Sequence, residues 1–128
     1  MGTMGTDLAA GPSAVSPAYA RERARGFLDA LARPLAREAE QSVVLVVSEL
    51  VTNALRHSGG TYTLELTAHP DGVEVAVHDP SPQAPVMHTP DLTGTGGFGW
   101  RMVNRLALAT HVTAAPGGGK TVRALLPR

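Results

Sequence analysis

Residues 43–58 read V-V-L-V-V-S-E-L-V-T-N-A-L-R-H-S, and the interpretation of the rest of the chain depends on this stretch. Its opening V-V-L-V-V is mostly β-branched, which by itself favours a buried strand. Over the whole stretch, the apolar residues instead follow the i, i+3, i+4, i+7 spacing of one helical face. They are Val43, Val46, Val47, Leu50, Val51, Ala54 and Leu55. Because this spacing persists over three turns, it outweighs the weak local propensity and predicts a helix.

The polar side of this helix carries a carboxylate and a carboxamide. Glu49 and Asn53 are four residues apart and therefore project from the same side, with Arg56 one turn further along and His57 at its edge. One interpretation is a solvent-exposed face. The other is a metal–phosphate site, in which the Asn53 oxygen ligates Mg²⁺ and Glu49 acts as a general base. The spacing alone leaves both interpretations open, although asparagine is a mediocre helix former in mid-helix.

Size and composition predict one globular domain. The chain has 128 residues, 43% of them hydrophobic and 17% charged. Its zero net charge argues against a general nucleic-acid binder, and the absence of cysteine excludes disulfides and cysteine zinc sites. No apolar run approaches the roughly 20 residues of a membrane span, and the N-terminus lacks a signal-peptide pattern. We therefore expect a cytoplasmic protein that contacts neither membrane nor nucleic acid directly.

Residues 1–16 predict a mobile tail with a short edge strand near residues 7–10, and residues 17–128 predict the folded domain. Ser16 is expected to cap the first helix at Pro17. The periodicities and turn residues then predict, in order, helices over 17–33 and 34–57, strands over 61–68 and 73–77, a helix after residue 99, and strands over 111–115 and 121–126.

A segment without regular pattern, residues 80–97, is rich in proline and glycine. Segments of this length are usually lids or binding loops, or else are disordered. It leads into G-T-G-G-F-G at residues 94–99, directly before a helix. Such a turn offers backbone N–H groups and the positive end of a helix dipole to phosphates, whereas the alternative is a plain glycine hinge.

A second glycine-rich stretch, A-A-P-G-G-G-K-T at residues 114–121, fits a loose phosphate-loop pattern. That motif binds phosphate only when a helix follows it. Because residues 122–126 alternate like a strand, the phosphate-loop interpretation is rejected.

Taken in this order, the helix with Glu49 and Asn53, the strand-end Asp79 and the glycine-rich lid resemble the GHKL group of ATP-binding domains. The greatest resemblance is to its small branch of anti-sigma-factor serine kinases. S-E-L-V-T-N-A-L-R-H-S is similar to the N-box of that branch, V-H-D-P-S-P-Q-A-P to its adenine-binding box, and G-G-F-G-W-R-M-V to its second glycine box. The resemblance covers residues 17–128.

The resemblance implies an α/β two-layer sandwich of the Bergerat type, with a mixed, mostly antiparallel sheet backed by about three helices. It further implies that ATP and Mg²⁺ bind between the N-box helix and the lid. By position, Asn53 would bind Mg²⁺, Glu49 would take the proton from a substrate serine, and Asp79 would accept a hydrogen bond from the adenine amino group. An Asp that reads this amine is expected to select adenine over guanine.

The remaining assignments implied by the resemblance concern the lid and the last strand. Gly97 and Gly99 would let the backbone approach the phosphates, and Thr121 would place a hydroxyl near adenine. The other nucleotide-binding candidates are Thr95, Gly96, Phe98 and Trp100, of which Trp100 is also expected in the core. The kinases of this branch carry an arginine where this chain has Thr95, so nucleotide binding is better supported than phosphotransfer.

The function implied is that of an ATP-binding regulator and protein serine kinase. It would bind a sigma factor and would phosphorylate a serine of a STAS-type anti-anti-sigma protein. One alternative is a nucleotide-gated protein-binding module without phosphotransfer, which Thr95 favours, and another is a detached histidine kinase catalytic domain. Homodimerisation through the edge of the first strand is left open.

Overall fold

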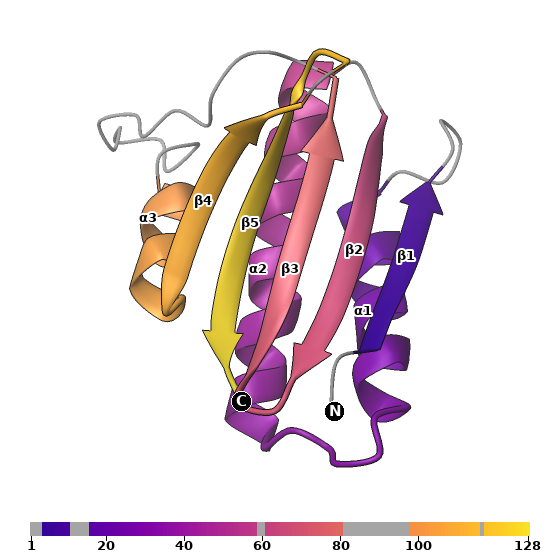
Figure 1. The fold of residues 1–128 in the computed structure, drawn as a ribbon, viewed down its shortest axis with the longest axis vertical. Helices are drawn as coiled ribbons and strands as arrows, with labels where there is room; N and C mark the ends of the chain where they lie inside the picture. The colour runs from indigo at the N-terminus through magenta and orange to yellow at the C-terminus, as the bar shows by residue number, and fades with distance from the viewer. Residues whose placement is uncertain (1–3, 11–15, 59–60, 81–97, 116) are drawn as a thin grey trace.

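The computed structural model describes residues 4–10, 16–58, 61–80, 98–115 and 117–128. Figure 1 shows the helices and strands in these ranges. Their bounds are β1 Met4–Ala10, α1 Pro17–Asp29, α2 Arg37–Ser58, β2 Tyr62–His69, β3 Gly72–Asp79, α3 Phe98–Leu106, β4 Ala109–Ala114 and β5 Lys120–Pro127. The helices and strands predicted from the sequence are all present, with ends that differ by a few residues.

The described strands form one sheet in the order β1-β2-β3-β5-β4. Every neighbouring pair in it is antiparallel, so the sheet of the described residues is antiparallel throughout rather than mixed. β1 is longer than the edge strand expected near residues 7–10 and pairs with β2 along its whole length. The central strand β3 pairs with β5 in a register that sets Asp79 opposite Lys120.

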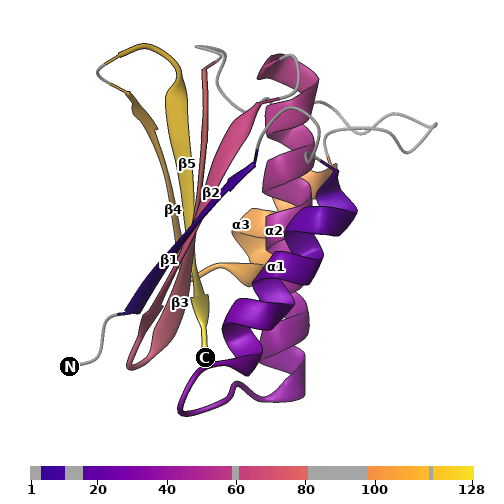
Figure 2. The same cartoon turned by 90° about the vertical axis from the view of Figure 1, so that its right-hand side faces the viewer.

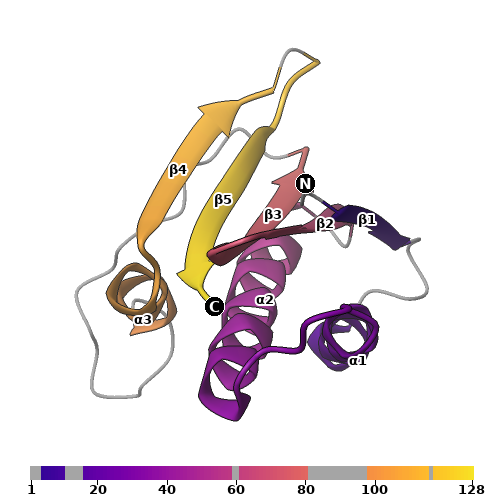
Figure 3. The same ribbon diagram turned by 60° about the horizontal axis from the view of Figure 1, so that its bottom comes forward.

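The helices α1, α2 and α3 of the described residues lie on one face of the sheet, as Figure 2 shows edge-on. α2 crosses the middle of the sheet and contacts β2, β3 and β5, while α1 packs beside it. α3 lies on the other side of α2, next to the β4–β5 end of the sheet (Figure 3). The two-layer α/β sandwich is therefore confirmed, and the core lies between α2 and the central strands.

The helical interpretation of residues 43–58 is confirmed, and the strand alternative is wrong. The residues that define its apolar face are at most 2% exposed, with the exception of the partly buried Leu55. Burial of each Val or Leu side chain contributes about 1.5–3 kcal/mol relative to exposure. Packing of this face against the sheet therefore outweighs the β-propensity of the valines.

α1 begins as expected but ends earlier. The Ser16 hydroxyl accepts a hydrogen bond from the Tyr19 N–H at 3.0 Å, which confirms the N-cap. The predicted end near Arg33 is wrong, because the Ala30 N–H already bonds to the carbonyls of Gly26 and Phe27 and tightens the last turn. Arg33 instead donates a hydrogen bond to the carbonyl of Pro70 in the β2–β3 turn.

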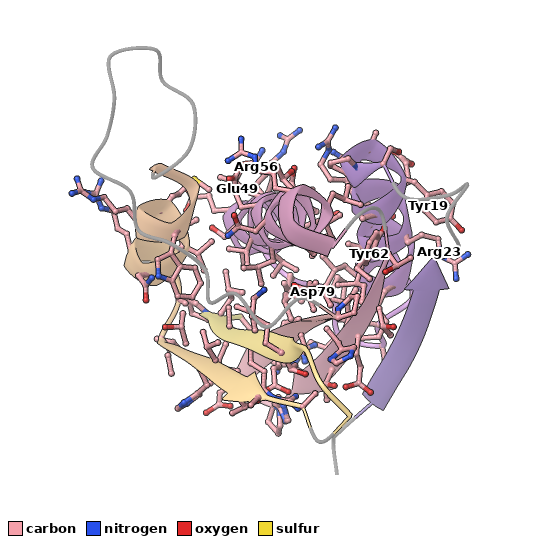
Figure 4. All side chains as sticks on the ribbon, turned by 90° about the horizontal axis from the view of Figure 1, so that it is seen from above. Tyr19, Arg23, Glu49, Arg56, Tyr62 and Asp79 are labelled. Carbon is pink, nitrogen blue, oxygen red and sulfur yellow. The ribbon has the colours of Figure 1, made fainter. Side chains whose placement is uncertain are left out.

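Tyr62, at the start of β2, is a buried titratable group beside α1. Burial, and to a smaller extent the neighbouring Tyr19, raises the pKa of Tyr62 above its ordinary value of 10.0. Figure 4 shows the two tyrosines on the same side of the molecule. Above that pH the unfolded chain therefore binds fewer protons than the folded domain at this position, and the free energy of unfolding falls as the pH rises.

We expect Tyr62→Phe to reduce this alkaline loss of stability, since phenylalanine has no proton to lose. The measurement is urea unfolding of both proteins at several pH values from about 8 to 11. Parallel losses of unfolding free energy in the wild type and the variant would contradict the expectation.

Candidate functional site

Glu49 of α2 touches the first turn of α3. A Cβ placed on Gly99 would lie 2.0 Å from Glu49 Oε1 and 3.0 Å from Glu49 Cδ, so only glycine permits this approach. Figure 4 shows Glu49 on the side of α2 that faces α3. A carboxylate beside the start of a helix interacts favourably with the positive end of its dipole. The helix that carries the predicted base and the end of the glycine-rich segment therefore meet in space.

Asn53 lies one turn after Glu49 on α2 and is half-buried. Among the described residues, no three His, Cys, Asp or Glu side chains are grouped so that they hold a metal ion. Mg²⁺ is usually bound by one or two side chains together with substrate phosphates and water. A single amide oxygen at Asn53 fits this mode of binding, in which the phosphates supply most of the negative charge.

β3 ends in a buried acid, Asp79, which is 2% exposed. Lys120 Nζ donates hydrogen bonds to Asp79 Oδ2 at 3.0 Å and to Oδ1 at 3.2 Å, and its own side chain is 6% exposed. Figure 4 shows Asp79 between the sheet and α2. Because isolated charges are costly to bury, the ammonium group of Lys120 offsets part of the cost of burying this carboxylate.

Lys120 and Thr121 project from opposite faces of β5, because side chains alternate along a strand. Lys120 shares the helix-facing side with the buried Val122, whereas the Thr121 hydroxyl lies 3.2 Å from His78 Nδ1 on the other face. The resemblance assigned Thr121 to the adenine site. The structure instead places Lys120 beside Asp79.

Sequence reasoning missed Lys120. A lysine after three glycines looks like part of an exposed turn, and lysines are seldom fully buried. The available signal was the alternation of β5: counting back by two from the apolar Leu126, Ala124 and Val122 reaches position 120, on the core side.

The predicted lid falls mostly on residues that the structure does not describe. Thr95, Gly96 and Gly97 lie outside the described residues, and of Phe98 only the place as first residue of α3 is described. Trp100 is half-buried and packs against the core, as expected for its helix. Within the part of this segment that the structure describes, Gly99 is the residue that contacts the candidate site.

A separate groove of about 650 Å³ lies between α1 and α2. It is lined by Arg21, Arg25, Arg37, Glu40, Gln41, Val44, Leu45 and Ser48. Arg21 Nη1 donates a hydrogen bond to Ser48 Oγ at 2.8 Å across it. None of the predicted nucleotide-binding residues lines this groove, so it is distinct from the candidate site.

The sequence model of the histidine kinase-like ATPase domain matches residues 14–125, which is most of the chain. The chain belongs to this family. The match spans both Glu49 and Gly99, as well as the Asp79–Lys120 pair, so all four lie within the histidine kinase-like ATPase domain.

Among solved structures, the domain is similar to the crystal structure of the RsbU and RsbW domains of Rv1364c from Mycobacterium tuberculosis. The TM-score is 0.64 at 20% identity, over 100% of this chain and 33% of that one. At this identity the likeness shows the fold, and this chain spans about a third of that protein's solved length. No curated protein sequence matches the chain.

Among the described residues, no helix combines the length and the apolar character needed to cross a bilayer.

Proposed function

We propose that this domain binds Mg-ATP between α2 and the start of α3, and that it is a regulator of the anti-sigma type which phosphorylates a serine of a STAS-type partner. The observation that carries the proposal is the contact of Glu49 with Gly99, which joins the two motifs that would hold the nucleotide. Membership of the histidine kinase-like ATPase family and the fold shared with a structure containing an RsbW domain support it.

Each side chain has a role that follows from its chemistry. Asn53 would hold Mg²⁺ through its amide oxygen, and Mg²⁺, when bound, neutralises charge on the phosphates. Glu49 is a carboxylate on a rigid helix and would accept the proton of the attacking serine hydroxyl. Asp79 would fix the base at the other end of the nucleotide. Phosphoryl transfer depends mainly on such positioning and charge neutralisation, which these residues provide.

The proposal is tested by incubating the domain with radiolabelled ATP and candidate STAS-type proteins. Acid-stable label on a serine of the partner is the expected result. Acid-labile label on a histidine would favour a detached histidine kinase domain. ATP binding without transfer would favour the nucleotide-gated binding module, the alternative that Thr95 in place of arginine supports.

Glu49→Gln is expected to retain ATP binding and to lower the rate of phosphotransfer by about 10²–10⁴-fold, because the amide has no basic lone pair for the serine proton. Binding is measured by calorimetry and transfer by label incorporation. Glu38→Gln, an exposed acid in the first turn of the same helix, is the matched control and should change neither. Near wild-type transfer by Glu49→Gln would exclude Glu49 as the base.

Gly99→Ala is expected to displace the Glu49 carboxylate and to reduce phosphotransfer, while the free energy of unfolding changes by no more than about 1 kcal/mol. The three atoms nearest to the new Cβ belong to the flexible side chain of Glu49, so this side chain can move aside while the backbone stays in place. Gly26→Ala in α1 is the matched control, since a Cβ there meets nothing within 4 Å. Unaltered transfer by Gly99→Ala would show that the position of Glu49 against α3 is unimportant.

The other expectations remain part of the proposal. They are binding of a sigma factor, homodimerisation at the β1 edge of the sheet and a cytoplasmic location. Pull-down with sigma factors and sedimentation of the purified domain address the first two.

A further inference from the structure

The buried pair of Asp79 and Lys120 goes beyond the site expected from the sequence. Its members lie opposite each other on β3 and β5, and both are buried where these strands pack against α2. A buried ion pair usually adds little net stability compared with apolar residues of similar size. Stability alone therefore does not explain why this position of the sheet holds an ion pair and not two apolar residues, and ligand recognition is a second reason for the pair.

The turn before β5 fixes the backbone of Lys120 relative to Asp79. Gly119 has φ +81°, and a Cβ there would lie 2.2 Å from the carbonyl oxygen of Asp79 and 2.7 Å from Cα of Pro80. The start of β5 is thus packed directly onto the end of β3. The contact therefore holds the backbone of Lys120 next to the end of β3, where Asp79 lies.

Side by side, the two groups offer a ligand both an acceptor and a donor. A carboxylate only accepts hydrogen bonds, whereas an ammonium group has three N–H donors. Within the described ranges, the acceptors of Lys120 Nζ are the two oxygens of Asp79. The ammonium group therefore has donor capacity for an acceptor on a bound base.

Purine bases differ in the order of donor and acceptor on their pairing edge. Adenine has an amino donor at C6 and an acceptor at N1, whereas guanine and hypoxanthine have an acceptor at O6 and a donor at N1. A carboxylate alone accepts from the adenine amine and repels O6. With an ammonium group beside it, O6 accepts from the lysine while N1–H donates to the carboxylate.

We propose that Lys120 reads the base together with Asp79, so that the site accepts the 6-oxopurine nucleotides GTP and ITP as well as ATP. This rests on the proposed function, because it requires the base to dock at Asp79. It replaces the expectation that Asp79 selects adenine over guanine, since that expectation considered the carboxylate without its neighbour.

The first test is calorimetric titration of the wild-type domain with MgATP, MgGTP, MgITP and MgUTP. GTP and ITP are expected to bind within about tenfold of ATP, because each purine edge finds both partners. UTP is the control for binding through the phosphates alone. A site that leaves a buried polar group unpaired rejects the wrong ligand by about 10⁴-fold or more. A site that accepts GTP and ITP is therefore easily distinguished from a site that is selective for ATP.

The second test uses variants of β5. Lys120→Met is expected to keep ATP binding within about tenfold and to weaken GTP and ITP by about 100-fold or more, since O6 would face an unshielded carboxylate. Lys120→Arg keeps a donor and should keep GTP and ITP binding. Arg123→Met removes a cation from the same strand, on the other face, and should leave the ranking of nucleotides unchanged.

The outcomes separate this assignment from the proposed function. If the wild type binds ATP and rejects GTP and ITP, or if folded Lys120→Met keeps the wild-type ranking, Lys120 does not read the base while ATP binding stands. If no purine triphosphate binds, both fail together. If circular dichroism shows that Lys120→Met does not fold, the wild-type ranking and Lys120→Arg decide.

Discussion

Asp79→Asn is expected to lower the free energy of unfolding by about 3–5 kcal/mol, because it leaves the Lys120 ammonium group buried without its counter-charge. ATP affinity is expected to fall by about 10–100-fold, which is the range for losing one hydrogen bond to a charged group. Urea unfolding gives the first quantity. Calorimetry at a temperature where the variant is folded gives the second.

Two controls isolate the cause of these effects. Glu74→Gln makes the same chemical change on the same strand, but Glu74 pairs with Arg123 at 3.9 Å on the half-exposed outer face. Its cost should be no more than about 1 kcal/mol, with unchanged ATP affinity. The double variant Asp79→Asn with Lys120→Met removes both charges and should recover most of the stability without recovering ATP affinity. Wild-type affinity in Asp79→Asn would refute the assignment of Asp79 to the base.

Gly119→Ala is expected to lower the free energy of unfolding by about 3 kcal/mol or more, because backbone strain and steric overlap both contribute. The residue has φ +81°, and its new Cβ would overlap the backbone of Asp79 and Pro80, which cannot turn aside as a side chain does. The turn must therefore open and carry Lys120 away from Asp79. Nucleotide affinity should fall together with stability.

The neighbouring glycines provide a graded comparison. Gly118 has φ +100° but an alanine Cβ there meets nothing within 4 Å, so Gly118→Ala should show the backbone cost alone, about 1–2 kcal/mol. Gly117 has open space and no such φ, and Gly117→Ala should change stability by less than about 0.5 kcal/mol. Equal effects of all three substitutions would show that contact with the end of β3 is unimportant.

The sequence was sufficient to predict an element where one strong pattern determined its secondary structure. The apolar spacing of residues 43–58 identified α2 against its own β-propensity, because a long amphipathic face gains more from burial than single residues gain from propensity. The same helix fixed Glu49 and Asn53 one turn apart. The sequence does not determine whether their side of the helix faces solvent, whereas the contact with Gly99 places Glu49 against α3.

The sequence was insufficient to identify a contact that depends on pairing between strands distant in the chain. Asp79 was recognised at the end of a strand, but its partner is 41 positions away and is chosen by the register of β3 with β5. A shift of that register by one residue would have brought Thr121 to the helix-facing side and Lys120 to the other. Whether Lys120 or Thr121 lies beside Asp79 is therefore determined by the pairing of the whole strands. A local sequence pattern does not contain this information.

The outer face of the sheet carries a second pair immediately behind the first. His78 and Thr121 are the chain neighbours of Asp79 and Lys120, so their side chains point to the opposite face of the sheet, where they meet at 3.2 Å. Figure 2 shows the helices on the other face. The imidazole of His78 is one peptide bond away from Asp79. Its NMR resonances should therefore change when a ligand binds at the Asp79 carboxylate. No label has to be attached to a residue that touches the ligand. A histidine on the uncovered face of the sheet can thereby report on ligand binding at Asp79, on the face that the helices cover.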